Sequence, residues 1–443
     1  MTPCAPTRSA PRLALVAIVR NEAPYLLEWI AHHQALGVRD LVIADNVSQD
    51  GTSELLEALD ALGEIRRLPF PDPPDRAPQL PAYAAMLETL SAAARDDPDA
   101  PQWAAIIDAD EYLVPEPLAD APVADWLGAA IAPVCDRAGV GAIAVNWALY
   151  GSSWLASQGA GLVTERFVRR AHAHFASNHH YKTLLRLRAW HTVSGNPHHM
   201  HLQPGWRLVH PDGSDARPHP YHGWGLSQEV VWSRLRLNHY IVKSREEFDA
   251  RKARNGSAAT RGRVKGDDYF RAHDRNDTRD ACDVRLIEAT RAKLSRLTAR
   301  LQATGCPLPP PATQPPRYLR PFEGVQGHVD RIVREGEAGR PRLRIRGWTM
   351  NGDGLPAAFF AIEGPQGRRM IADYEPFARP DIQRHFPMAH PRCGFELLLD
   401  LDTLATGPGL DDLADTLRIR AGDDPNRLSS PLPIPPQVLA TLR

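Results

Sequence analysis

The strongest constraint on the fold is an alternation of apolar and amphipathic segments over residues 13–107. Leu13 to Val19 (LALVAIV) is apolar throughout, as expected of a strand buried on both faces. A helical pattern follows, then a short apolar strand at 41–44, and the alternation continues to the apolar residues 104–107. Strands and helices that alternate in this way form a parallel sheet with right-handed crossovers. We therefore predict an α/β fold with a mostly parallel sheet flanked by helices.

Two polar loops follow the first two predicted strands, VRNE at 19–22 and ADNVSQDGT at 44–52. Ligands of open α/β sheets bind beyond the carboxyl ends of the strands, where these loops lie. Asp45 and Asp50 are candidates to accept hydrogen bonds from ribose hydroxyls or a base, and Arg20 is a candidate phosphate contact. The simpler interpretation is that polar residues of these loops cap the helices that follow.

The segment IIDADEYLVP, residues 106–115, places two carboxylates one residue apart directly after a buried strand. In an extended chain Asp108 and Asp110 point the same way and can reach one divalent ion. Carboxylate oxygens favour Mg²⁺ or Mn²⁺ over zinc, and such an ion typically bridges to a substrate diphosphate. The alternative is a polar loop after a core strand, because this short pattern arises by chance in many proteins.

Composition excludes several classes of protein. The chain of 443 residues has 43% hydrophobic and 24% charged residues, with 52 Lys+Arg against 53 Asp+Glu. This near-neutral balance disfavours a nucleic-acid-binding protein. The glycine-rich phosphate loops of dehydrogenases and P-loop NTPases are absent. No apolar run is long enough for a transmembrane helix and no signal peptide is evident, so we expect a cytoplasmic protein.

The second half of the chain contains the clearest boundary, seven prolines between Pro307 and Pro321, which predict a semi-rigid linker. A helix is predicted before the linker, at 279–304. Short alternating segments separated by turn residues follow it and predict an antiparallel β-sandwich. The expected parts are an α/β domain at 12–255, a helical extension at 256–306, the linker at 307–321 and the β-sandwich at 322–443.

Several of these segments resemble a known family of enzymes. The stretch from VAIVRNE to DGTSELL, together with IIDADEYLVP, resembles the nucleotide-sugar-binding half of bacterial family-2-type glycosyltransferases, which have the GT-A fold. NWALYGSS, YKTLLR and NHYIVKSREEF resemble segments of the branch related to the family 92 galactosyltransferases. The resemblance covers roughly residues 12–255. It implies transfer of a sugar from a nucleoside diphosphate sugar, expected to be UDP-linked, to a hydroxyl acceptor.

The resemblance also implies roles for individual residues. Asp108 and Asp110 match the pair that holds Mn²⁺ or Mg²⁺ on the donor diphosphate, and His239 matches a late histidine added to the metal shell. Gly151 matches a glycine loop that lines the donor sugar and the acceptor. The positions expected to bind the donor are Arg20, Asn21, Glu22, Asp45, Asp50, Asp108, Gly151 and Lys182.

The catalytic base is expected after the glycine loop, because inverting GT-A enzymes place an Asp or Glu there. Glu165 is the first candidate and Glu229 the second. A salt bridge from Glu165 to one of three nearby arginines is the competing interpretation; these arginines are Arg166, Arg169 and Arg170.

The expected acceptor is a glycan or lipid-linked glycan of bacterial surface or extracellular glycan synthesis. We expect no nucleic-acid partner, and peripheral membrane association is a further option.

Two other classes of protein fit parts of the chain. One is a non-catalytic glycan-binding protein, and the other is a metal-dependent hydrolase that binds zinc through His199 and His201. Histidines are frequent between His172 and His222, and we favour a polar, ring-rich acceptor cleft as their role. The tryptophans that could stack on sugars, or simply pack in the core, are Trp147, Trp154, Trp206, Trp224 and Trp232.

Overall fold

The computed structural model describes residues 11–252, 265–314, 324–336, 341–352, 354–386, 389–404, 412–423, 425 and 428–442. The chain divides into two compact units, Met1–Arg317 and Tyr318–Arg443. The expected helical extension and proline-rich linker lie partly outside the described residues.

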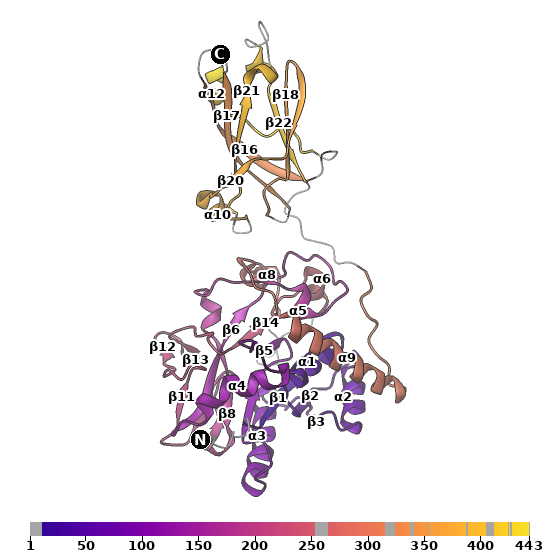
Figure 1. Ribbon diagram of the computed structural model, residues 1–443. Helices are drawn as coiled ribbons and strands as arrows, with labels where there is room; N and C mark the ends of the chain where they lie inside the picture. The colour runs from indigo at the N-terminus through magenta and orange to yellow at the C-terminus, as the bar shows by residue number, and fades with distance from the viewer. Residues whose placement is uncertain are drawn as a thin grey trace, which may run out of the picture. The chain divides into compact units, whose positions relative to one another are not determined.

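The first unit is built on one large, curled sheet (Figure 1). Its strands lie in the order β3 (Arg66–Pro69), β2 (Asp40–Asp45), β1 (Leu13–Val19), β4 (Trp103–Ile106), β8 (Tyr181–Arg186), β6 (Val140–Leu149), β14 (Leu235–His239) and β5 (Glu111–Pro115), with β11 (Arg207–Val209) beside β6. Strands β3, β2, β1 and β4 are parallel, whereas β8 runs antiparallel between β4 and β6. The predicted α/β class with a mostly parallel sheet flanked by helices is confirmed.

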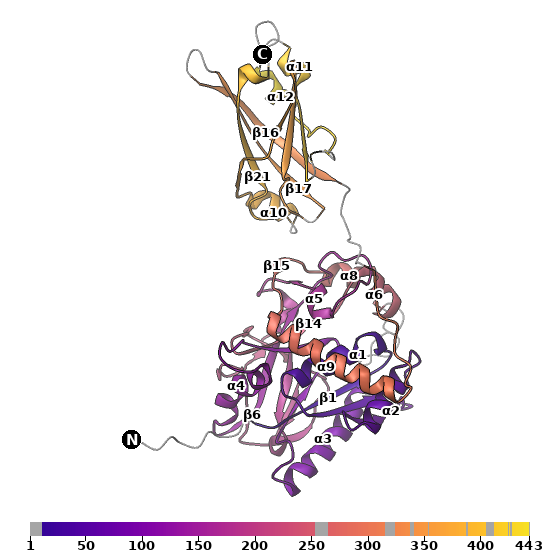
Figure 2. The ribbon, with the colours of Figure 1, turned by 45° about the vertical axis from the view of Figure 1, so that its right-hand side comes forward.

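Helices cover both faces of this sheet, and every residue of β1 is therefore buried. Leu15 and Ala17 belong to the core cluster that includes α1, α2, α4 and α9, whereas Val16 and Ile18 pack with α3 on the opposite face. Figure 2 shows α9 lying along α1. The main helices of this unit are α1 (Ala23–Ala35), α2 (Thr52–Ala61), α3 (Gln79–Asp96), α4 (Val123–Cys135), α5 (Val163–Arg166), α6 (Arg245–Glu247), α8 (Asp267–His273) and α9 (Val284–Ala303).

Two helix ends show how local sequence sets these boundaries. Gly37 follows α1 with φ +87°, and a β-carbon there would lie 2.4 Å from the carbonyl oxygen of Ala124, so only glycine fits. Helix α9 begins at Val284 rather than near residue 279, because the Asp283 carboxylate accepts a hydrogen bond from the backbone N–H of Arg285.

The second unit consists of two antiparallel sheets around a shared core. One sheet contains β16 (Val325–Glu335), β17 (Arg342–Asn351), β21 (Gly394–Asp400) and β20 (Glu375–Phe377), and the other contains β19 (Gly367–Ile371), β18 (Phe359–Gly364) and β22 (Arg418–Gly422). Ile345 and Phe395 of the first sheet share one buried cluster with Phe360 and Ile419 of the second. This arrangement is the predicted antiparallel β-sandwich.

Helix α1 supports β5, the strand at one end of the large sheet, through side chains bonded to its backbone. The indole N–H of Trp29 donates to the carbonyl of Glu111 at 2.8 Å. The Nε2 atom of His32 lies 2.8 Å from the carbonyl oxygen of Leu113, and the Leu113 N–H donates to Nε2 of His33 at 3.3 Å. Because edge-strand backbone groups otherwise need water or another strand, these side chains complete the edge.

Both histidines are held neutral by burial. Burial lowers the pKa of His32 to about 4 and that of His33 well below its ordinary value, despite hydrogen bonds that favour the charged form. His33 accepts at Nε2, so its proton is on Nδ1, which donates to the carbonyl of Trp29.

Acidification should therefore destabilise the first unit. Between pH 6.5 and about 4 the unfolded chain binds a proton on His32 that the folded chain excludes, so the free energy of unfolding should fall by up to about 1.4 kcal/mol per pH unit for this residue. Urea unfolding at pH 7, 6 and 5, followed by tryptophan fluorescence, measures the slope. His32→Gln should remove this share of the slope, and the same change at solvent-exposed His191 should not. Equal slopes in both variants would contradict the assignment.

Candidate active site

The turn between β4 and β5 carries three carboxylates at the carboxyl end of a parallel strand. Residues 108–111 form a turn, in which the N–H of Glu111 donates to the carbonyl of Asp108 at 3.0 Å. Asp110 and Glu111 are buried, and 32% of the Asp108 side chain is exposed. The chain is therefore not extended here, and Asp108 and Asp110 contact different partners.

A buried lysine pairs with two of these carboxylates. Strand β8 carries Lys182, whose side chain is fully buried, with Nζ 2.9 Å from Oδ2 of Asp108 and 3.6 Å from Oε2 of Glu111. Burial alone would lower the pKa of Lys182, but the two carboxylates outweigh it and hold the pKa well above its ordinary value. The ammonium group therefore stays charged inside the protein.

The two carboxylates respond to this environment in opposite ways. The second oxygen of Asp108 accepts hydrogen bonds from the Tyr83 hydroxyl at 2.9 Å and the Gln79 amide at 3.0 Å. Burial acts to raise the pKa of Asp108, but Lys182 holds it below its usual value. Burial raises the pKa of Glu111 well above its usual value, with Lys182 only partly offsetting it.

Asp110 faces the end of β14. Its Oδ1 lies 3.4 Å from Nε2 of His239, and both side chains are buried. The ring of His239 packs 4.2 Å from that of Trp147, centroid to centroid, and the Trp147 indole N–H donates to Glu111 at 2.7 Å. Asp110 and His239 were predicted as metal ligands from different parts of the sequence, and the fold brings them together.

Two further histidines surround the same tryptophan. His180 stacks on Trp147 with centroids 4.7 Å apart, and His198 meets it edge-on at 5.0 Å. Burial lowers the pKa of His180 to about 4 and that of His198 well below its usual value. Sequence reasoning grouped these residues only as part of a histidine-rich region, because no spacing rule connects them to residues 108–111.

The donor atoms fit a divalent ion that also takes substrate oxygens. Among the described residues no set of three His, Cys, Asp or Glu side chains is placed to hold a metal alone. A carboxylate and an imidazole, Asp110 and His239, can hold Mn²⁺ or Mg²⁺ when diphosphate oxygens and water complete the shell. Asp108 lies beside Lys182, so it would reach the ion only by sharing its carboxylate.

The loops after β1 and β2 are joined by hydrogen bonds. The N–H groups of Asn21 and Glu22 donate to the hydroxyls of Ser48 and Thr52 at 3.1 and 2.8 Å, and the N–H of Ala23 donates to Asp50 at 3.2 Å. Residue 21 does not cap α1, as its φ of +56° and the position of the N-cap at Glu22 show. The cap comes from the other loop.

Asp45 and Arg20, predicted to contact the donor, have protein partners. Asp45 is buried and accepts hydrogen bonds from Arg67 at 2.8 and 3.1 Å and from Ser53 at 3.0 Å. Arg20 pairs with Asp72 at 3.3 Å, and both side chains are 44% exposed. Donor contacts of these residues remain predictions, and of the two only Arg20 is open to solvent.

Glu22, a third predicted donor contact, pairs with Arg251 at 2.6 Å. The Arg251 guanidinium also lies over the ring of Tyr25, 4.6 Å from its centroid, and donates to the carbonyl of Asn21. The segment after β14 thus reaches the loop after β1.

The loop after β6 is held by the segment before α9. A β-carbon on Gly151 would lie 2.5 Å from the carbonyl oxygen of Arg275, so this loop and that segment are in close contact. The N–H groups of Ser152 and Ser153 donate to Asp274 and Asn276 at 2.6 and 2.7 Å. The contact explains the glycine without a ligand.

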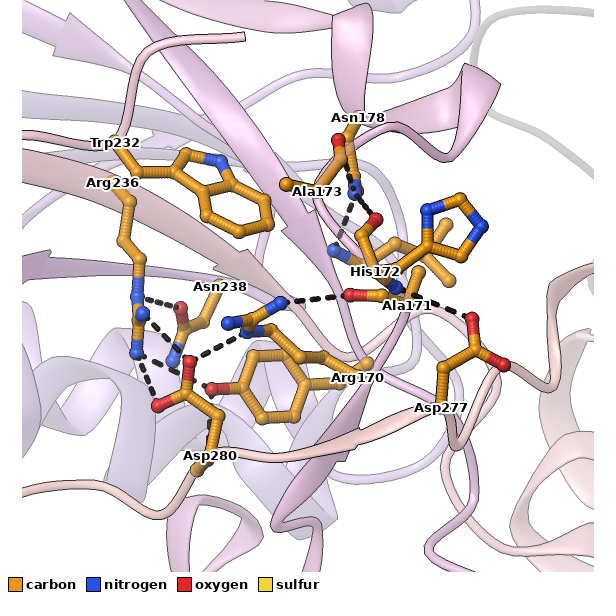
Figure 3. A network of polar contacts seen from close by, with 12 residues as sticks. Arg170, Ala171, His172, Ala173, Asn178, Trp232, Arg236, Asn238, Asp277 and Asp280 are labelled. Carbon is orange, nitrogen blue, oxygen red and sulfur yellow. Dashed lines mark hydrogen bonds and ion pairs between the residues drawn. The ribbon is translucent and has the colours of Figure 1, made fainter. Parts of the chain in front are cut away.

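The same segment continues into an ion-pair network (Figure 3). Asp280 accepts hydrogen bonds from Arg170 at 2.5 Å and from both terminal nitrogens of Arg236 at 2.8 Å. The carbonyl of Asp280 also accepts from the Tyr150 hydroxyl at 3.0 Å, and Arg170 lies over the ring of Trp232. This network fixes β14, the strand that ends at His239, against the loop after β6.

The two candidate bases differ in their surroundings. Glu165 on α5 accepts hydrogen bonds from the Arg291 guanidinium of α9, the shortest at 2.6 Å, and from the N–H of Leu162 at 2.9 Å. The salt bridge considered from the sequence exists, but with Arg291. Glu229 is exposed, and its carboxylate has no hydrogen bond or ion pair among the described residues. Its backbone oxygen accepts from Ser227, which is bonded to Asn146 beside Trp147.

The other aromatic candidates have protein partners of their own. His199 is bonded to the Tyr181 hydroxyl at 3.0 Å and stacked on Trp224, which does not support a zinc site with His201. The remaining tryptophans are each covered by an arginine; they are Trp154 under Arg169, Trp206 under Arg188 and Trp232 under Arg170. Among the described helices, none combines the length and apolar character that a bilayer span requires.

Comparison with known proteins connects part of this chain to one family. Residues 16–122 match the model of glycosyltransferase family 92, a stretch that begins within β1, runs through β5 and includes Asp108 and Asp110. A glycosyltransferase family 92 protein of Oryza sativa subsp. japonica is 39% identical over 54 residues, which are 12% of this chain. The aligned part spans only 9% of the rice protein's length.

Solved structures show weaker likeness. A mycobacterial protein is 17% identical over 31% of this chain and 41% of its own, with a TM-score of 0.20. Residues 1–349 of S. aureus TarS are 13% identical over 40% of this chain and 48% of that chain, with a TM-score of 0.24. The longer TarS structure is 10% identical over 96% and 77%, with a TM-score of 0.26. Scores of this size carry no inference about fold or function.

Removal of the buried lysine should unfold or severely destabilise the first unit. Lys182→Met leaves the Asp108 carboxylate, whose pKa lies below its usual value, without the cation 2.9 Å away, and such a loss costs about 3–5 kcal/mol. The same substitution at half-exposed Lys293 should change the free energy of unfolding by less than about 0.5 kcal/mol. Urea unfolding at pH 7 compares the two. A double variant Lys182→Met with Asp108→Asn should recover part of the loss, and no recovery would contradict the pairing.

Proposed function

We propose that the chain is a glycosyltransferase that moves a sugar from a nucleoside diphosphate sugar to a hydroxyl acceptor. The observation that carries the proposal is the convergence of Asp108, Asp110, Lys182 and His239 at one sheet edge, within and beside the stretch that matches glycosyltransferase family 92. Carboxylate and imidazole groups can hold a divalent ion, and such an ion can neutralise a diphosphate. UDP is the nucleotide we expect, from the family resemblance.

The catalytic part is proposed to be a GT-A-like domain at 12–255. Helix α9, which lies in the expected extension at 256–306, supports it, because α9 packs along α1 and buries Leu286 and Leu297 in the same core. We propose that the loops after β1 and β2 receive the nucleoside, with Arg20, Asp45 and Asp50 as the polar contacts. Their mutual hydrogen bonds would give the donor a preformed surface.

Asp110 and His239 are the residues that would hold Mn²⁺ or Mg²⁺. When bound, the ion supplies positive charge to the departing diphosphate, which lets the anomeric bond break towards an oxocarbenium-like state. Lys182 keeps Asp108 oriented and adds a fixed positive charge at the same edge. The neutral rings of Trp147, His180 and His198 exclude water from the buried side of the site.

We propose Glu229 as the base that takes the proton of the acceptor hydroxyl, in preference to Glu165. A general base needs a free lone pair within reach of the acceptor. The Glu165 carboxylate is occupied by Arg291 and Leu162, which supports a structural role instead. Glu229 lies on a segment bonded to Asn146, the neighbour of Trp147. An inverting reaction is proposed on the same grounds.

The acceptor is proposed to be a glycan or lipid-linked glycan of surface or extracellular glycan synthesis, handled at the cytoplasmic side. This part of the proposal comes from the family resemblance alone. No nucleic-acid partner is proposed, because the net charge of the chain is −1.

UDP should raise the melting temperature of the protein, and Mn²⁺ should increase the effect. A ligand that binds only the folded state adds about 2.7 kcal/mol of stability at 100 times its Kd. Asp110→Asn should lose the part of the shift that depends on Mn²⁺, because the ion loses a carboxylate ligand, whereas Asp120→Asn on the exposed surface should keep it. A thermal-shift assay with UDP, GDP and CDP, each with and without Mn²⁺, makes the measurement. No response of the native protein to any of them would rule out the proposal.

Glu229→Gln should lower the turnover of donor by about 10²–10⁴-fold, because glutamine cannot accept a proton. The KM for the UDP-sugar should change little. Release of UDP from a set of UDP-sugars, with water as the acceptor, reports turnover.

Two variants serve as references for this measurement. Glu165→Gln should keep near-normal turnover and lose some thermal stability, since it weakens the contact to Arg291. Glu116→Gln, an exposed carboxylate elsewhere, should be neutral in both. If Glu165→Gln alone abolishes turnover without unfolding the protein, the base is Glu165.

A further inference from the structure

The hairpin of β12 (Pro218–His219) and β13 (Gly223–Ser227) exposes large aromatic side chains. Tyr221 at its tip is 88% exposed and Trp224 is 42% exposed. The ring of Trp224 lies parallel to that of His199, with centroids 4.8 Å apart and an angle of 9° between the planes. One face of the indole is therefore covered by His199, while 42% of the residue remains exposed.

Hydrogen bonds and a close contact hold the backbone at Trp224 and Gly225 in place. Its carbonyl accepts a hydrogen bond from the Asn196 amide at 3.1 Å. The next residue, Gly225, has φ +101°, and a β-carbon there would lie 2.1 Å from Asn196. The Gly225 N–H donates to the Tyr181 hydroxyl, which also contacts His199 at 3.0 Å. A ring fixed in advance loses little entropy when it binds a ligand.

A second group of rings surrounds Tyr221. The ring of His219 lies 6.0 Å from that of Tyr221 and 4.8 Å from that of His222, and His179 meets His219 edge-on at 5.6 Å. Imidazole nitrogens lie in the ring plane and can donate or accept hydrogen bonds. The hairpin thus combines aromatic faces with polar atoms around them.

We propose that the hairpin is a carbohydrate-binding platform that holds an uncharged oligosaccharide, the acceptor of the proposed glycosyltransferase, so this inference rests on the proposed function. The C–H face of a pyranose ring packs on an aromatic face, whose negative quadrupole attracts the partly positive hydrogens. The sugar hydroxyls then reach the polar ring nitrogens. This chemistry suits a sugar better than a purely apolar partner, which would offer no hydrogen bond to exposed His222 or to the Nε2 atom of His219.

The base of the hairpin connects directly to the candidate active site. Tyr181, which bonds to Gly225, precedes Lys182 on β8. Asn146, which bonds to Ser227 of β13, precedes Trp147 on β6. The hairpin is therefore anchored on the two strands that also carry Lys182 and Trp147, although neighbouring residues of a strand point to opposite faces of the sheet.

Charge disfavours an anionic membrane surface as the occupant of these rings. The segment 210–229 contains Asp212, Asp215 and Glu229 against the single cation Arg217, a difference of two negative charges with histidine neutral (1 − 3 = −2). Aromatic side chains that anchor proteins to anionic lipid act together with basic residues. A neutral glycan pays no such electrostatic cost.

The test is a titration of the full chain with maltopentaose, cellopentaose, chitopentaose and β-1,4-galactopentaose, followed by saturation-transfer NMR. We expect at least one to bind and the double variant Tyr221→Ala, Trp224→Ala to bind it about tenfold more weakly or not at all. Val284→Ala, at a residue of the same unit that is 62% exposed, should bind like the native protein.

The same double variant should keep the thermal shift produced by UDP, which separates this inference from the proposed function. If UDP does not shift the melting temperature of the native protein, the proposed glycosyltransferase function is wrong. The carbohydrate-binding platform still stands in that case if oligosaccharide binding depends on Tyr221 and Trp224. Three outcomes would overturn the platform. The first is that none of the four oligosaccharides binds, and the second is that the double variant binds them as well as the native protein. The third is that the double variant differs from the native protein only in sedimenting less with phosphatidylcholine–phosphatidylglycerol vesicles.

Discussion

The buried ammonium group of Lys182 is the interaction on which the candidate site depends. It is placed by β8, the strand that runs antiparallel between two parallel parts of the sheet, and it lies between the carboxylates of Asp108 and Glu111. Charged groups this deep are stable only with their partners, so the strand order and the site geometry require each other. A change in the register of β8 by one residue would turn Lys182 to the opposite face of the sheet.

Other contacts extend this dependence outward. Glu111 receives the indole N–H of Trp147, and its carbonyl receives the indole N–H of Trp29 from α1. Helix α1 in turn supports the outer backbone groups of β5 through His32 and His33. The acidic turn is therefore fixed from the sheet, from the helix layer and from the ring cluster, which is the preorganisation that charge-stabilising sites require.

Local sequence patterns predicted the elements well and their long-range partners poorly. The continuous apolar run predicts β1, the helical spacing of apolar residues predicts α1, and Gly37 marks the end of that helix. Asp50 was predicted from its loop as a contact to the donor nucleoside. Its hydrogen bond to the first turn of α1 could not be predicted, because it depends on how two loops meet. The partner of Glu165 is Arg291, far along the chain, whereas sequence reasoning could consider only nearby arginines. His198 carried no signal beyond composition, because its neighbour Trp147 is reached only through the fold.

The position of β8 in the sheet also has a consequence for how the chain acquires its structure during synthesis. Strands β1 to β4 and their helices form a local, parallel unit that can assemble as soon as it leaves the ribosome. Asp108 and Glu111 then remain in water as free carboxylates until β8 pairs with β4, and His239 arrives later still. Docking of β8 is thus the event that converts a hydrated acidic turn into a buried, charged site. Because this pairing closes a long loop, we expect it to be the slow step in folding of the first unit.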